Sequence, residues 1–141
     1  MKKAAKLKKI LLISALSIVA LAFFFFSYTL RVIYQDVKAT CLKAQREYEE
    51  DCVNSLIKLV QSDKKTFRER NTAIWALGQL ADKRALPALK SLYTGKIPPK
   101  ESFSQTLSQY ELKKAIQWCE KGNATSWMYR LPLSFPFLKL F

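Results

Sequence analysis

Residues 66–92 read TFRERNTAIWALGQLADKRALPALKSL, and this stretch decides the fold of the domain. Thr66 and Glu69 have the spacing of a capping box, in which a hydroxyl and a carboxylate satisfy free amides at the start of a helix. Apolar residues then recur at helical spacing as far as Leu80. Asp82 opens a tight turn, and Pro87 stands in the first turn of a second helix, where a missing amide costs least. The stretch therefore predicts two helices joined by a short turn.

The residues expected to face inward share this helical spacing on both members of the pair. On the first helix they are Ala73, Ile74, Leu77, Leu80 and Ala81, and on the second they are Leu86, Leu89, Leu92 and Tyr93. Such stripes are typical of helices that bury one face against a neighbour. We therefore expect an antiparallel packing of the two.

A further amphipathic helix is predicted before this pair. Four apolar residues recur there at i, i+3, i+4 and i+7, and acidic residues precede them, which suits the helix dipole. The four are Val53, Leu56, Ile57 and Val60. We expect this helix to cover residues 51–61, after a break in the polar stretch 46–51.

The sequence after the pair predicts a loop and then another helix. Residues 96–104 include Pro98 and Pro99, which are typical of a loop. Ser108 and Glu111 have the spacing of a second capping box, and Gly122 is a helix stop. The buried stripe between them consists of Leu112, Ala115, Ile116 and Cys119.

An apolar run of twenty-one residues, Ile10–Leu30, contains no charged side chain. As a helix rising about 1.5 Å per residue it is about 31 Å long, which matches the hydrocarbon core of a bilayer. We expect a transmembrane helix over residues 10–30. Because neither Gly nor Pro occurs before Gly78, the helix can continue beyond the membrane.

The charges around this run predict its orientation. Five lysines lie within residues 1–9, which places that segment in the cytoplasm and the domain outside by the positive-inside rule. A cleaved signal peptide is the alternative, since Ala20-Leu21-Ala22 has the form of a cleavage site. Cleavage there would leave four phenylalanines at the new N-terminus, and a signal core is usually only about 7 to 15 residues long. We favour a single-pass anchor in the cytoplasmic membrane.

The composition argues against catalysis. The chain has no histidine, which removes the commonest general base and most zinc sites, and its three glycines form no phosphate-cradling arrangement. We expect no catalytic residue, metal site, cofactor or small-molecule substrate. From residue 31 onward the chain has nineteen basic and eleven acidic residues, so the net charge of this part is +8. Such a charge suits binding to anionic lipid, acidic wall polymer or an acidic protein. The predicted topology argues against nucleic acid.

Residues 71–92 resemble a HEAT repeat of the type found in bilin-lyase-like proteins. In that family Ala and Leu side chains pack two antiparallel helices, an Asp and an Arg organise the turn, and a proline follows. The matching residues here are Asp82, Arg84 and Pro87, whereas Ala81 stands where the family often has glycine. The likeness covers about one repeat, and such solenoids usually need three or more repeats to bury a continuous core. The helices on either side would have to serve as half-repeats and caps.

The whole layout is similar to a group of small, single-pass bacterial HEAT-repeat proteins of uncharacterised role. In those proteins the repeat is followed, as here, by the sequence QYELKKAI at residues 109–116. The resemblance implies an armadillo-like helical scaffold and not lyase activity, because nothing matches a tetrapyrrole-attachment site. The expected fold is all-α: a transmembrane helix, a HEAT-like array over residues 31–122 and an apolar tail over residues 123–141.

The candidate partner contacts lie where the central helix opens. Arg68, Arg70 and Asn71 are expected to be exposed, as polar residues on the concave face of a solenoid would be. Trp75 and Tyr110 could add to that surface. Aromatic residues at helical spacing are more often core, and we interpret both as core.

Three cysteines, Cys41, Cys52 and Cys119, would lie in an oxidising compartment under this topology. Cys41 and Cys52 cannot bond within one straight helix, because eleven residues separate them by about 16 Å whereas a disulfide needs Cα atoms less than about 7 Å apart. A bend at residues 48–51 would permit that bond. Cys52 with Cys119 would instead tie two helices together, and free buried thiols are the third option.

The tail is rich in large apolar residues but too short and broken by proline to span a bilayer. These apolar residues are Leu131, Leu133, Phe135, Phe137, Leu138, Leu140 and Phe141. We expect the tail to pack on the helices, to rest on the membrane interface or to enter a partner's groove.

Together these features predict a membrane-anchored, non-enzymatic protein–protein interaction module on the outer side of the cytoplasmic membrane. The first alternative is an envelope-surface binder that attaches the domain to anionic lipid or wall polymer. The second is an enzyme accessory subunit.

Overall fold

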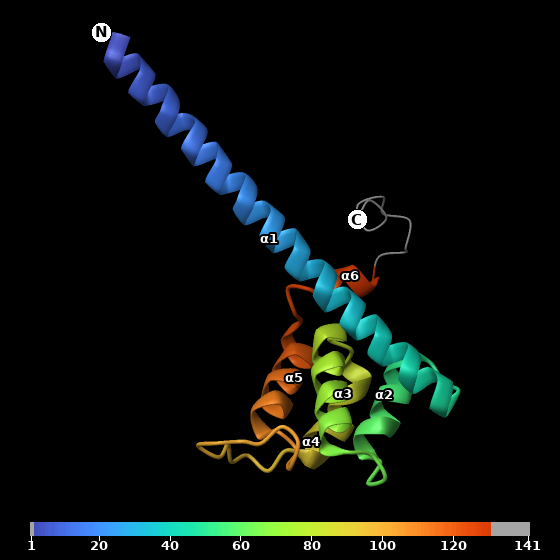
Figure 1. Ribbon diagram of the computed structural model, residues 1–141. Coiled ribbons are helices and arrows are strands. Elements are labelled where there is room, and N and C mark those ends of the chain that lie inside the picture. Colours follow the sequence, from blue (N-terminus) through green and yellow to red (C-terminus); the bar gives the residue numbers. More distant parts are fainter. Residues whose placement is uncertain (1, 131–141) are drawn as a thin grey trace. The chain divides into compact units, whose positions relative to one another are not determined.

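The computed structural model describes residues 2–130, and every regular element among them is a helix, which confirms the all-α prediction. In chain order these elements are α1 (Lys2–Tyr48), α2 (Cys52–Gln61), α3 (Phe67–Leu80), the 3-10 helix η1 (Lys83–Ala85), α4 (Leu86–Leu92), α5 (Gln109–Lys121) and α6 (Trp127–Arg130) (Figure 1). Contacts group the chain into a first unit up to Tyr34 and a second unit from Gln35.

The first unit is the N-terminal part of α1, and its run from Ile10 to Leu30 carries no charged side chain. Large hydrophobic side chains from Ile10 to Phe26 are exposed. The hydroxyls of Ser14, Ser17 and Thr29 each donate to the carbonyl four residues earlier, at 2.9–3.0 Å, so these polar groups are satisfied within the helix itself. The helix is long and apolar enough from Lys8 onward to cross a membrane, although a signal sequence passes the same test of length and composition.

The start and stop residues of the second unit largely follow the sequence-based predictions. Asp51 caps α2 by accepting from the amide of Val53 at 3.0 Å. The capping box of Thr66 and Glu69 opens α3, as predicted. Gly122 ends α5 with a φ of 92°, a conformation that favours glycine.

The second capping box is only half formed. Ser108 accepts from the amide of Glu111 at 3.1 Å, but the Glu111 carboxylate pairs with Lys114 and does not reach back. Its place is taken by Asn71 of α3, whose side-chain oxygen accepts from the amide of Ser108 at 2.9 Å. The box fails because Asn71 already binds the amide that the Glu111 carboxylate would have to reach, while Glu101 of the preceding loop accepts from the next amide, that of Gln109, at 2.7 Å.

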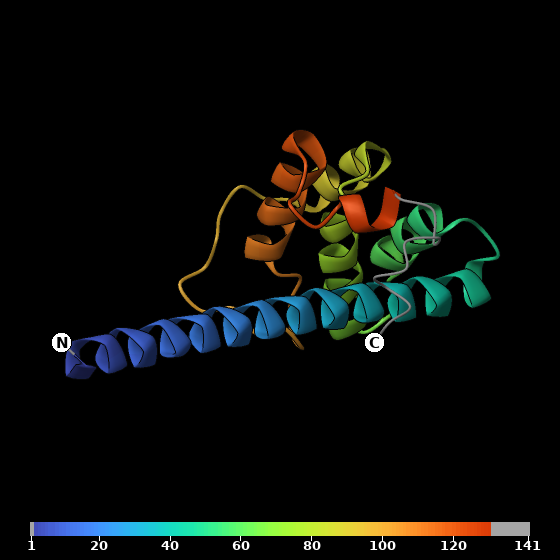
Figure 2. The same ribbon diagram turned by 90° about the horizontal axis from the view of Figure 1, so that it is seen from above.

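The core of the second unit is centred on α3, which lies between α2 and α5, and α4 lies beside α5 (Figures 1 and 2). Ile74 and Leu77 of α3 are fully buried. A Cβ added at Gly78 would meet the backbone of Ala115 at 3.0 Å, so α3 and α5 approach as closely as a glycine allows. The predicted stripe of α5 is buried as expected.

The last turns of α1 belong to this core. Val37, Cys41 and Ala44 are buried and join the same apolar cluster as α3. The break between α1 and α2 falls at residues 49–51, as the sequence predicts. The C-terminal turns of α1 therefore act as part of the helical domain.

Residues 123–130, which the sequence-based boundaries assign to the tail, also pack on the domain. Asn123 and Thr125 both donate to the side-chain oxygen of Gln79, at 3.1 and 2.6 Å. Met128 of α6 is buried. The remaining tail, Leu131 to Phe141, lies outside the described residues, and so does the expectation about its packing.

Leu77 tests the packing of the helix pair. Leu77→Ala should lower the free energy of unfolding by about 2 to 5 kcal/mol, because a fully buried leucine leaves a cavity when truncated. Lys83→Ala, at an exposed position, should change it by less than about 0.5 kcal/mol. Chemical denaturation of the full chain in micelles measures both values. Equal stability of the two variants would contradict the packing.

Candidate partner-binding site

Arg70 is buried and serves the connection between α2 and α3. Its side chain is 7% exposed. The guanidinium donates from Nε to the carbonyl of Val60 at 2.8 Å and from Nη1 to Asp63 at 3.2 Å. The expectation of an exposed Arg70 is therefore wrong. The reason is that the end of α2 leaves a buried carbonyl that needs a donor.

Asn71 is fully buried and clamps the loop before α5. Its Nδ2 donates to the carbonyls of Phe103 at 2.9 Å and Thr106 at 2.8 Å, and its Oδ1 accepts from the amide of Ser108 at 2.9 Å. The expectation of exposure is wrong here as well. Both donors and the acceptor are used within the fold, so Asn71 is not available to a partner.

Arg68 is the one residue of the predicted trio that is exposed. It lies on the same face of α3 as Thr72 and Trp75, four and seven residues later. Thr72 and Trp75 line an open hollow of about 390 Å³ together with Phe103 and with Asp36, Ala39 and Thr40 of α1. A second hollow along α1 adjoins it at Ala39. The exposed face of α3 thus carries Arg68 and, further along the helix, the hollow that Trp75 and Phe103 line.

The two aromatic residues interpreted as core differ in outcome. Trp75 is half-buried and packs against the core, as expected. Tyr110 is 55% exposed, and the Lys114 ammonium lies 5.2 Å from its ring centroid. The core interpretation of Tyr110 is wrong, because this residue lies two positions before Leu112 and so off the buried stripe of α5.

Glu69 ties the end of α1 to the start of α3. Its carboxylate accepts from Lys43 of α1 at 2.8 Å and from the amide and hydroxyl of Thr66 at 3.2 and 3.0 Å. These bonds, chiefly the one from Lys43, lower the pKa of Glu69 to about 2. Glu69 therefore stays ionised at neutral pH and keeps its ion pair with Lys43, which lines the second hollow.

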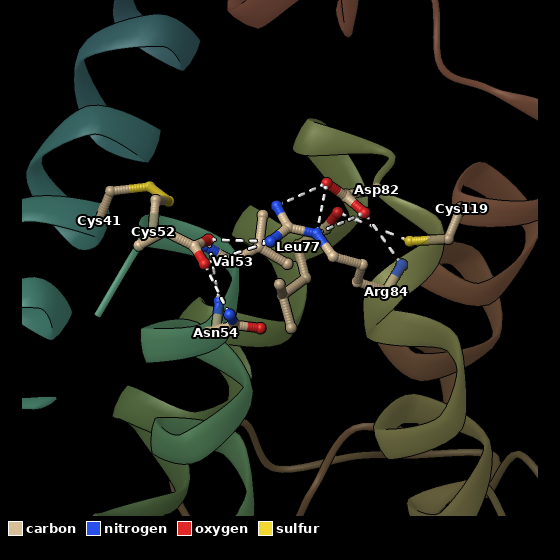
Figure 3. Close-up of polar contacts among 9 residues, drawn as sticks. Cys41, Cys52, Val53, Asn54, Leu77, Asp82, Arg84 and Cys119 are labelled. Carbon is tan, nitrogen blue, oxygen red and sulfur yellow. Dashed lines mark hydrogen bonds and ion pairs between the residues drawn. A yellow bond between two sulfur atoms is a disulfide. The ribbon is translucent and has the colours of Figure 1, made fainter.

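The turn after α3 joins two helix caps through one arginine (Figure 3). Asp82 accepts from the amide of Arg84 at 2.9 Å, and the guanidinium of Arg84 binds both Asp82 and Asp51, at 3.0 and 3.2 Å. Hydrogen bonding from Arg84 lowers the pKa of Asp82. Ala81 adopts a left-handed conformation with a φ of 51°, a region that glycine enters without steric cost. Pro87 lies in the first turn of α4.

The structure pairs Cys41 of α1 with Cys52 of α2 in a disulfide, with Cα atoms 5.0 Å apart (Figure 3). The chain break at residues 49–51 supplies the bend that this bond needs. Cys119 is free and buried, and its thiol contacts the carbonyl of Leu77 at 3.7 Å. Burial raises the pKa of Cys119 to about 11, so its thiol is not a nucleophile at neutral pH. Within residues 2–130 no group of His, Cys, Asp and Glu could hold a metal ion.

The family model of the PBS lyase HEAT-like repeat matches residues 69–94. This chain contains a HEAT-like repeat. The repeat consists of α3, the Asp82 turn and α4, and the family is one of helical scaffolds that generally mediate protein interactions. No curated protein and no solved structure matches the chain.

Asn71 and Arg68 provide a matched test of the corrected site. Asn71→Ala should lower the free energy of unfolding by about 3 kcal/mol or more, because it leaves two carbonyls and an amide without partners at about 1 to 3 kcal/mol each. Arg68→Ala should stay within about 0.5 kcal/mol of the wild type. Thermal and urea unfolding of the full chain measure both. A stable Asn71→Ala variant would refute the clamp.

Proposed function

We propose that this protein is a membrane-anchored, non-enzymatic scaffold that holds a protein partner on the exposed face of its HEAT-like repeat. Its domain lies on the outer side of the cytoplasmic membrane. The observation that carries the proposal is that α1 has two parts of different character. This helix contains an apolar run long enough to span a bilayer, and its last turns belong to the core of the repeat domain.

Two observations support the outer location. The lysines before the apolar run favour a cytoplasmic N-terminus. The pairing of Cys41 with Cys52 suits an oxidising compartment, since disulfides seldom persist in the cytosol. A disulfide at this place also joins α1 directly to α2.

The exposed face of the repeat supports a protein partner. Arg68 is exposed on the face of α3 that carries Thr72 and Trp75, which line the hollow. Arginine and large aromatic residues are the residue types that dominate binding energy in protein interfaces. The absence of histidine from the sequence favours binding over catalysis.

The first arm of the test concerns anchoring and side. A reporter that is active only outside the cytoplasm, fused after Phe141, should be active, and the full-length chain should resist extraction from membranes at alkaline pH. A reporter that is active only in the cytoplasm would contradict the proposed side. A full-length chain released by alkali would contradict the anchor.

The second arm concerns the partner. A photo-crosslinking residue at Ala39, which lines both hollows, should capture a specific protein in intact cells, whereas one at Lys121 on α5 should not. Arg68→Ala should remove that capture while the melting temperature stays near the wild-type value. Capture that is equal from both positions, or unaffected by Arg68→Ala, would show that this face does not bind the partner.

A further inference from the structure

The connection between α4 and α5, residues 93–108, presents an unusual surface. Ile97 and Phe103 are 41% and 43% exposed. Lys96 and Lys100 are exposed too, and neither has a carboxylate partner within the described chain. Two apolar side chains and two cations therefore point outward from one connection.

The only acidic residue of this connection is turned inward. Glu101 accepts hydrogen bonds from the hydroxyl of Ser108 at 2.5 Å and from the amide of Gln109 at 2.7 Å. It lies at the N-terminus of α5, where the helix dipole favours a negative charge. Its charge is thus satisfied inside the fold, and the outward charge of the connection is entirely positive.

The backbone that carries these side chains is braced. Asn71 binds the carbonyls of Phe103 and Thr106, and the side chain of Gln109 accepts from the amide of Thr94 at 2.8 Å. A braced loop loses little conformational entropy on binding. The backbone that carries Ile97 and Phe103 is therefore already ordered before these side chains contact another surface.

The hollow that Phe103 lines is joined to the apolar run by a short stretch of chain. Phe103 lines the same hollow as Asp36. Asp36 is six residues after Leu30, and six residues span at most about 20 Å in any conformation. If residues 10–30 span a membrane, a tether this short allows the connection to touch the lipid head groups.

We propose that residues 93–108 dock on the anionic lipid surface of the membrane in which the chain is anchored. Lys96 and Lys100 bind lipid phosphates, and Ile97 and Phe103 enter the interface. This inference rests on the anchor of the proposed function, but not on its protein partner. Aromatic and apolar side chains flanked by lysine are the combination that suits a head-group region.

The expected strength is modest and depends on the tether. A lysine near an anionic membrane surface contributes about a fivefold gain in binding. Two lysines alone would hold a free domain weakly. Tethering through α1 raises the effective concentration of the membrane, so the same contacts suffice in the full chain.

The test uses the full chain in nanodiscs of phosphatidylcholine alone or mixed with phosphatidylglycerol. Ser104→Cys, next to Phe103, carries an environment-sensitive fluorophore, because Cys119 is buried and the other two cysteines are paired. In the anionic nanodiscs the emission should shift to the blue and acrylamide should quench the label less than in neutral ones. About 1 M salt, which shortens the Debye length to about 3 Å, should abolish the difference.

Matched variants separate charge at this site from total charge. Lys96→Ala with Lys100→Ala should lower the ratio of docked to free loop about 25-fold, at about fivefold per lysine. Phe103→Ala should also lower it, without loss of the Asn71 clamp, which uses only the backbone carbonyl of Phe103. Lys113→Ala with Lys121→Ala removes the same charge from α5 and should leave docking unchanged.

Three results would overturn the proposal. They are equal quenching in neutral and anionic nanodiscs, an equal effect of the two lysine pairs, and protection that appears only when a soluble anionic polymer is added to neutral nanodiscs. A chain that does not insert is not recovered with the nanodiscs. Failure to recover the chain with the nanodiscs would contradict the anchor. A chain that is recovered but whose loop stays accessible to acrylamide would contradict only the docking of residues 93–108.

Discussion

The constraint on which this structure depends is that a single HEAT-like repeat cannot cover its own first helix. Repeats of this kind normally bury a continuous core by stacking on their neighbours. Here α3 is buried between α2 and α5, and the last turns of α1 join the same cluster through Val37, Cys41 and Ala44. Gly78 lets α5 approach closely enough for this to work. The flanking helices thus replace the missing repeats.

The same constraint determines the roles of the polar residues on α3. A helix enclosed on several sides brings the ends of neighbouring elements into the interior, where their backbone groups need partners. Arg70 and Asn71 supply these partners, and Glu101 does so for the first turn of α5. In a long solenoid such polar residues would face a partner. In this short array they instead form hydrogen bonds with backbone groups of the neighbouring elements. Arg68, two residues before Arg70, faces solvent and does not have this role.

Local signals in the sequence predicted most of the fold. Capping residues, helical stripes and turn residues act over a few positions, so the helices, the Thr66 box and the Asp82 turn could be read directly. The burial of Arg70 and Asn71 could not, because it depends on carbonyls ten to thirty-five residues away. Glu101 was missed for the same reason. The sequence left the Cys41–Cys52 pairing open among several options. Only the position of the bend between α1 and α2, which the structure shows, selects it.

Under the proposed function α1 has two roles: its apolar run anchors the chain, and its last turns complete the core of the repeat domain. The most direct measurement is native-state hydrogen exchange of the full chain in nanodiscs, followed by mass spectrometry. If the account is right, the amides of residues 37–44 in α1 exchange with the same free energy of opening as those of residues 73–79 in α3, because both open only when the domain unfolds. Exchange of residues 37–44 at a clearly lower free energy than α3 would contradict it, since α1 would then detach while the repeat stays folded.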